Sequence, residues 1–89
     1  MNNLFSDLPT DLREEVFEKI VESSSVQIER IISKGHHSPK DFWYDQDQHE
    51  WVIVLMGAAR IQVESTGEVL ELNTGSFLNI PAHQRHRVD

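Results

Sequence analysis

The sequence predicts a mainly β protein, a small antiparallel sandwich or barrel with one helix at its N-terminus. From residue 26 onwards, short apolar segments are separated by turns about every eight to twelve residues, which is typical of such folds. Before residue 26, one stretch has apolar residues at helical spacing. A chain of 89 residues makes a single domain with a small hydrophobic core.

Residues 1–25 are predicted to form a tail and a helix that pack on the rest of the domain. Thr10 is a suitable N-cap, and Asp11 and Glu14 follow it in the first turn. The apolar residues on one face of this helix are Leu12, Val16, Phe17 and Ile20. The helix is expected to end near Glu22, before three consecutive serines.

Residues 26–89 are predicted to form the β domain. Apolar and polar residues alternate over 26–33, which indicates a half-buried strand. A loop follows, and its adjacent His36 and His37 are expected to be solvated. The run Trp51–Met56 is apolar on both faces and is expected to be a central strand covered on both sides.

The remaining residues predict a hairpin and one more strand. Apolar residues alternate with polar ones over 59–64, a turn follows at Ser65–Gly67, and a second strand is expected at 69–72. Phe77–Ile80 is expected to be the last strand, which Pro81 stops.

Two spacings within this region match known motifs. Glu50 is followed after six residues by Gly57, and Gly75 is followed after five residues by Pro81 and later by His86. These are the second half of the first cupin motif and the second cupin motif. The chain therefore resembles a small single-domain cupin, which implies a jelly-roll (double-stranded β-helix) barrel over 26–89.

The resemblance departs from the family at several positions. His83 stands where the second motif usually has glycine. The two histidines of the first motif are replaced by Tyr44 and Gln46 at the shorter spacing, or by Trp43 and Asp45 at the longer one. A complete cupin has a further strand beyond the position of Asp89, so the barrel is either truncated at its C-terminus or closed differently.

The resemblance implies a pocket in the barrel lumen lined by Tyr44, Gln46, Glu50 and His86. Gln46, Glu50 and His86 would be the ligands of a divalent metal such as Zn, Fe, Mn or Ni. In the alternative, the same polar groups hydrogen-bond to one another without a metal. Because neighbours on a strand point to opposite faces, Tyr44 is expected to face the lumen and Trp43 the outside.

Three functions remain open, and they differ in whether the protein binds a ligand and whether it catalyses a reaction. The first is a non-catalytic protein that binds a small polar molecule in the lumen, and the missing histidine pair favours it. The alternative is a metal-dependent cupin enzyme, an isomerase, epimerase or dioxygenase, with Glu50 and His86 as the catalytic residues. A purely structural role is a third interpretation.

Composition restricts the partners and the cellular location. A formal charge of −7 disfavours nucleic acid, although Arg85 and Arg87 beside His83 and His86 suggest local contact with an anionic ligand. The chain has no cysteine, which fits a cytoplasmic location, and no run of the roughly 18 apolar residues that a membrane span needs. The small core and the strand edges predict a homodimer.

Overall fold

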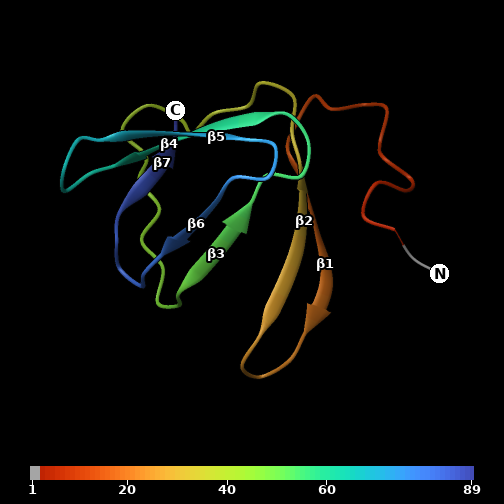
Figure 1. The fold of residues 1–89 in the computed structure, drawn as a ribbon, viewed down its shortest axis with the longest axis horizontal. Coiled ribbons are helices and arrows are strands. Elements are labelled where there is room, and N and C mark those ends of the chain that lie inside the picture. The colour runs from red at the N-terminus through yellow and green to blue at the C-terminus, as the bar shows by residue number, and fades with distance from the viewer. Residues whose placement is uncertain (1–2) are drawn as a thin grey trace. The chain divides into compact units, whose positions relative to one another are not determined.

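The computed structural model describes residues 3–89, in which the regular elements are all β-strands (Figure 1). The strands are β1 (Val16–Glu22), β2 (Gln27–Ile32), β3 (Glu50–Ile53), β4 (Ala58–Val63), β5 (Val69–Asn73), β6 (Phe77–Ile80) and β7 (His86–Val88). The chain divides into two compact units, one up to His36 and the other His37–Asp89. Over residues 3–89 there is no helix long and apolar enough to span a membrane.

The first unit is built on a hairpin, so the predicted N-terminal helix is wrong. β1 pairs antiparallel with β2, from Val16 opposite Ile32 to Glu22 opposite Gln27. The three serines that were expected to end a helix form the hairpin turn instead. The backbone N–H of Ser23 donates to the carbonyl of Val26 over 2.8 Å, and the Ser23 hydroxyl accepts the N–H of Val26 over 3.1 Å.

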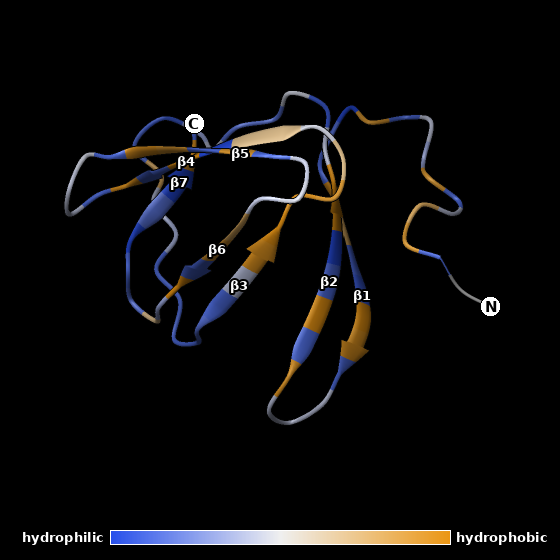
Figure 2. Ribbon diagram, viewed as in Figure 1, coloured by the Kyte–Doolittle hydropathy of each residue, from blue (hydrophilic) through white to orange (hydrophobic). Residues whose placement is uncertain are grey.

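The error has a physical cause in the composition of β1. The sequence VFEKIVE fits a helical period, but it also contains three β-branched residues, Val16, Ile20 and Val21, which favour a strand. The next apolar segment lies three serines away and can pair with it directly. Figure 2 shows hydrophobic and hydrophilic residues alternating along β2. Tertiary pairing therefore overrides the amphipathic pattern.

The second unit contains two sheets. β4 lies between β5 and β7 in an antiparallel three-stranded sheet, and β3 pairs antiparallel with β6. The predicted hairpin is present, because β4 and β5 are joined by a turn in which Gly67 has a φ of +71°. The predicted strand at 77–80 is β6, with the same bounds.

These sheets are not closed into a barrel, so that part of the expected fold is also wrong for the described residues. A barrel needs a continuous ladder of strand pairs around its circumference. Here the strands of the second unit have three to six residues, and each ladder ends before it joins the next sheet. β3 pairs with β6, and the chain then turns at Gly57, where φ is +89°.

The segment Trp51–Met56 is likewise not a strand covered on both faces. β3 ends at Ile53, and the side chain of Trp51 is 59% exposed. Trp51 and Phe77 form an aromatic pair on the outer face of β3 and β6, with ring centroids 5.7 Å apart. The buried hydrophobic residues are Ile80, on the opposite face of β6, together with Ile61 and Val63 of β4 and Leu72 of β5.

Candidate functional site

A cavity of about 200 Å³ lies in the second unit, between the three-stranded sheet and β6. Its apolar lining residues are Ile61, Val63, Leu70, Leu78 and Ile80. Its polar lining residues are Thr66, Glu68, Asn79, Gln84 and His86. The alternation of β4 produces this lining, because Ile61 and Val63 point inward while Arg60, Gln62 and Glu64 point outward.

His86, at the start of β7, is the buried polar residue of the cavity, with 5% of its surface exposed. It lies opposite Val63 in the β4–β7 ladder, which places its ring on the inner face of the sheet. Nδ1 of His86 is 2.9 Å from the carbonyl oxygen of Gln84. In the neutral ring Nδ1 is therefore the donor, and Nε2 carries the free lone pair that can accept a proton or bind a ligand.

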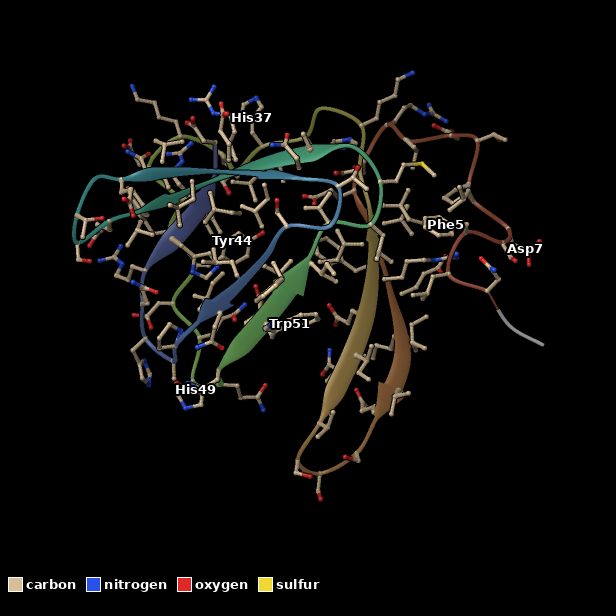
Figure 3. The ribbon with its side chains drawn as sticks, in the orientation of Figure 1. Phe5, Asp7, His37, Tyr44, His49 and Trp51 are labelled. Atoms are coloured by element: carbon tan, nitrogen blue, oxygen red, sulfur yellow. The ribbon has the colours of Figure 1, made fainter. Side chains whose placement is uncertain are left out.

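Tyr44 covers the ring of His86. The two rings are stacked with centroids 5.5 Å apart and an angle of 22° between their planes. The backbones also pair, because the N–H of Tyr44 donates to the His86 carbonyl over 2.7 Å and the N–H of His86 to the Tyr44 carbonyl over 3.1 Å. Figure 3 shows Tyr44 among the side chains between β4–β5 and β6. Tyr44 is half-buried against His86, and it is not among the residues that line the cavity.

The segment before Tyr44 is hydrogen-bonded to β7, the strand that begins with His86. Ser38, which is buried, donates its backbone N–H to the carbonyl of Val88 over 2.9 Å and accepts the N–H of Val88 on its hydroxyl over 3.0 Å. Residues 38–44 thus protect the open edge of β7 and fix the position of Tyr44 against His86.

The other two predicted pocket residues lie at the end of β3 and in the loop before it. Glu50, which is half-buried, is opposite Ile80 in the β3–β6 ladder, so its side chain is on the same face as a residue of the lining. Gln46 is placed through its backbone, since its carbonyl accepts the N–H of His83 over 2.8 Å. The structure therefore brings Tyr44 and His86 into contact, and of the four predicted pocket residues it is His86 that lines the cavity.

Three histidines of the region have structural contacts outside the cavity. His83 has a φ of +64°, and its Nδ1 is 3.0 Å from the carboxylate of Asp45 and its Nε2 3.6 Å from that of Asp47. Nδ1 of His49 accepts the N–H of Ala82 over 3.0 Å. Of the two loop histidines that were expected to be solvated, His37 is exposed (Figure 3), whereas His36 is half-buried and its Nδ1 accepts the N–H of Lys34 over 2.9 Å. The loop before β3 and the turn before β7 are thus tied together by polar contacts.

The arginines of β4 and β7 point away from the cavity. Arg60 pairs with Asp89 over 3.0 Å, and Arg85 pairs with Glu64 over 3.4 Å. Arg87 donates to the carbonyl of Ser38 over 3.1 Å and lies 5.8 Å from the centre of the Trp43 ring. The sequence grouped Arg87 with His86, but alternation along β7 sends the two side chains to opposite faces.

The predicted metal ligands Gln46, Glu50 and His86 are a weak set of donors. They offer one imidazole, one carboxylate and one amide, and an amide oxygen is a neutral and weak donor. Among residues 3–89 there is no group of three or more His, Cys, Asp or Glu side chains placed to hold a metal ion. This donor set does not fit a tightly bound divalent metal, and we derive no chemical step through one.

Four polar residues of the lining were missed in the sequence: Thr66, Glu68, Asn79 and Gln84. Thr66 and Glu68 belong to the β4–β5 turn, where polar residues are common and give no signal of a site. Gln84 lies two residues before His86, and this spacing is the one clue that could have placed it beside the pocket.

A solved structure resembles this chain closely. It is the crystal structure of "a putative mannose-6-phosphate isomerase" from Ralstonia eutropha JMP134, with a TM-score of 0.93 and 44% sequence identity over 99% of this chain and 82% of that one. This chain belongs to the same family as the Ralstonia protein. The family shares the mainly β fold described above, which is compatible with a cupin. No family model and no curated protein matches the chain.

Proposed function

We propose that this member of the Ralstonia protein's family is a cupin that binds a small polar molecule in the cavity beside His86. The spacing of Glu50, Gly57, Gly75 and His86 supports the assignment to the cupins, as does the β-rich fold of its relative. A cytoplasmic location is part of the proposal, since the chain has no cysteine.

The observation that carries the proposal is the buried imidazole of His86 at a cavity. A buried imidazole is costly unless its nitrogens have hydrogen-bond partners. The Gln84 carbonyl orients the ring through Nδ1, and this leaves Nε2 as the acceptor. An oriented imidazole that is covered by the Tyr44 ring, in a cavity also lined by Gln84 and Glu68, is suited to hydrogen-bond a small ligand.

The test is ligand screening by thermal shift, followed by titration of the histidine signals in NMR. A ligand should raise the melting temperature of the wild type and shift the resonances of the His86 ring. His86→Ala should abolish both effects, whereas His37→Ala, at an exposed histidine, should leave them unchanged. Retained binding in the His86→Ala variant would contradict the proposal.

A second candidate is an enzyme, a sugar isomerase, and the name of the Ralstonia protein favours it. Conversion of an aldose to a ketose moves one proton from C2 to C1 and a second from the C2 hydroxyl to the C1 carbonyl oxygen. Glu50 and His86 are the groups that would carry these two protons. The test is incubation with mannose 6-phosphate and with mannose, and detection of the ketose product. Glu50→Gln should abolish turnover without removing binding.

Elemental analysis of untagged protein separates the two candidates further. A non-catalytic binding protein with the donor set described above should contain well under one equivalent of Zn, Fe, Mn or Ni. A stoichiometric metal that Glu50→Gln and His86→Ala both release would instead support a metal-dependent enzyme, with Gln46 as the third ligand.

A further inference from the structure

We infer that the ligand of the cavity is a small, uncharged, polyhydroxylated molecule, a sugar or polyol without a phosphate group. The inference rests on the proposed function and specifies the class of molecule that the same cavity accepts. It follows from the size of the cavity, from the arrangement of its polar and apolar residues, and from the position of the charged side chains around it.

The cavity suits a ligand smaller than most cofactors and drugs. Its volume is about 200 Å³. Pockets for drug-sized ligands typically have volumes of about 300 to 1,000 Å³. A molecule with the dimensions of a monosaccharide or a short polyol is the appropriate size class.

The lining separates into an apolar base and a polar rim. Ile61, Val63 and Ile80 are buried at the base, whereas Thr66 and Glu68 are exposed. Asn79 is opposite Trp51 in the β3–β6 ladder, so its side chain is on the outer face of β6. The rim and the half-buried Gln84 offer a hydroxyl, a carboxylate and an amide. Sugar hydroxyls both donate and accept, so they can satisfy this mixture, and the C–H faces of the sugar can contact the apolar base.

The charges at the cavity favour a ligand without a phosphate. Glu68 brings a carboxylate to the rim, where it attracts hydroxyl donors and repels a phosphate. Arg60, Arg85 and Arg87 could neutralise a phosphate, but they bond to Asp89, Glu64 and the Ser38 carbonyl respectively, and none of the three lines the cavity. The site therefore presents negative charge where a sugar phosphate would need positive charge.

The experiment compares neutral and phosphorylated sugars by NMR titration of the ¹⁵N-labelled full chain. The probes are mannose, fructose, xylose and mannitol, each tested beside mannose 6-phosphate. At least one neutral probe should shift the signals of His86 and Gln84, with an affinity about tenfold or more above that of mannose 6-phosphate.

A charge-neutral variant tests the role of Glu68. Glu68→Gln should reduce the preference for the neutral sugar by about threefold, because the carboxylate lies at an exposed rim where charge effects are modest. Glu71→Gln is the matched control. It removes the same charge from β5, at a position opposite Arg60 on the outer face, and should leave the preference unchanged.

The outcomes separate the inference from the proposed function. Tighter binding of mannose 6-phosphate, at the same residues, would overturn the inference and keep the proposal of a small-molecule site. An equal effect of both variants on the preference would also overturn it. If no sugar probe shifts the signals of the cavity residues at millimolar concentration while another small molecule does, the assignment to sugars is wrong. If no small molecule of any class shifts these signals, the proposed site itself fails.

Discussion

His83 occupies a backbone position whose conformation favours glycine. Its φ of +64° lies in the left-handed region, at the place where the second cupin motif usually has glycine. The side chain contacts Asp45, so the residue offsets a strained backbone with a polar contact between two loops.

A pair of substitutions separates these two effects. His83→Ala and His83→Gly both lose the contact with Asp45, but alanine keeps the strain and glycine relieves it. The free energy of unfolding should be higher for the glycine variant by about 0.5–1 kcal/mol, after allowance for the larger entropy of its unfolded chain. Urea denaturation measures this difference. Equal stability of the two variants would show that the backbone at this position is unstrained.

From the sequence, some residues of the site could be named, but not how the strands bring the site together. His86 and Tyr44 were found because strand alternation and motif spacing are local properties. Glu68 was missed because it lies in a polar hairpin turn, and Asn79 because β6 pairs with β3, a strand that is distant in sequence. The helix expected at residues 10–22 failed for a related reason, since VFEKIVE fits both periods and its partner β2 decides between them.

At the level of elements, the β1–β2 hairpin is attached to the residues before it by one side chain. Arg30, with a side chain that is 14% exposed, bonds to Glu18 across the hairpin and donates to the carbonyls of Leu4 over 3.1 Å and Ser6 over 2.7 Å. Glu18 and Arg30 are directly opposite in the ladder, so the ion pair reinforces the register.

Arg30→Ala should release residues 4–6 and destabilise the hairpin by about 1–3 kcal/mol, the range for loss of partly buried, charge-assisted hydrogen bonds. Limited proteolysis should then cut near Phe5 faster than in the wild type (Figure 3). Arg13→Ala is the control, because Arg13 is exposed and pairs with its near neighbour Asp11. Unchanged cleavage in Arg30→Ala would show that the arginine does not hold this segment.

The segment 38–44 offers a second test at the same scale. Ser38→Ala removes the hydroxyl that accepts the N–H of Val88 and leaves that donor without this partner in a partly buried place. The free energy of unfolding should fall by about 1–2 kcal/mol, whereas Ser65→Ala in the exposed β4–β5 turn should change it by less than about 0.5 kcal/mol. Chemical denaturation of the three proteins provides the comparison.

For the whole molecule, we expect a homodimer. The described core contains four buried hydrophobic residues, and the outer face of β3 and β6 exposes Trp51 and Phe77 by 59% and 66%. Large exposed aromatic groups on a sheet with open edges are typical of a surface that a partner covers. This face carries no charge at Trp51, Ile53, Phe77 or Asn79, so two copies of an acidic chain can meet there without repulsion.

Light scattering at micromolar concentration should give the mass of two chains. Phe77→Lys should shift the equilibrium towards the monomer by placing like charges at the contact, and Ser65→Lys, with the same added charge in a turn, should not. A wild-type protein with the mass of one chain would contradict the expected homodimer. A dimer that Phe77→Lys leaves intact would place the contact elsewhere.

The ring that covers His86 also has a practical consequence, because Tyr44 is the single tyrosine of the chain. Labelling with fluorotyrosine would therefore introduce one fluorine resonance, and that resonance would come from a ring stacked on His86, which lines the cavity. Occupancy and exchange of a ligand could be followed in this one signal without assignment of the spectrum and without any substitution. The stacking contact thus gives the protein its own spectroscopic reporter.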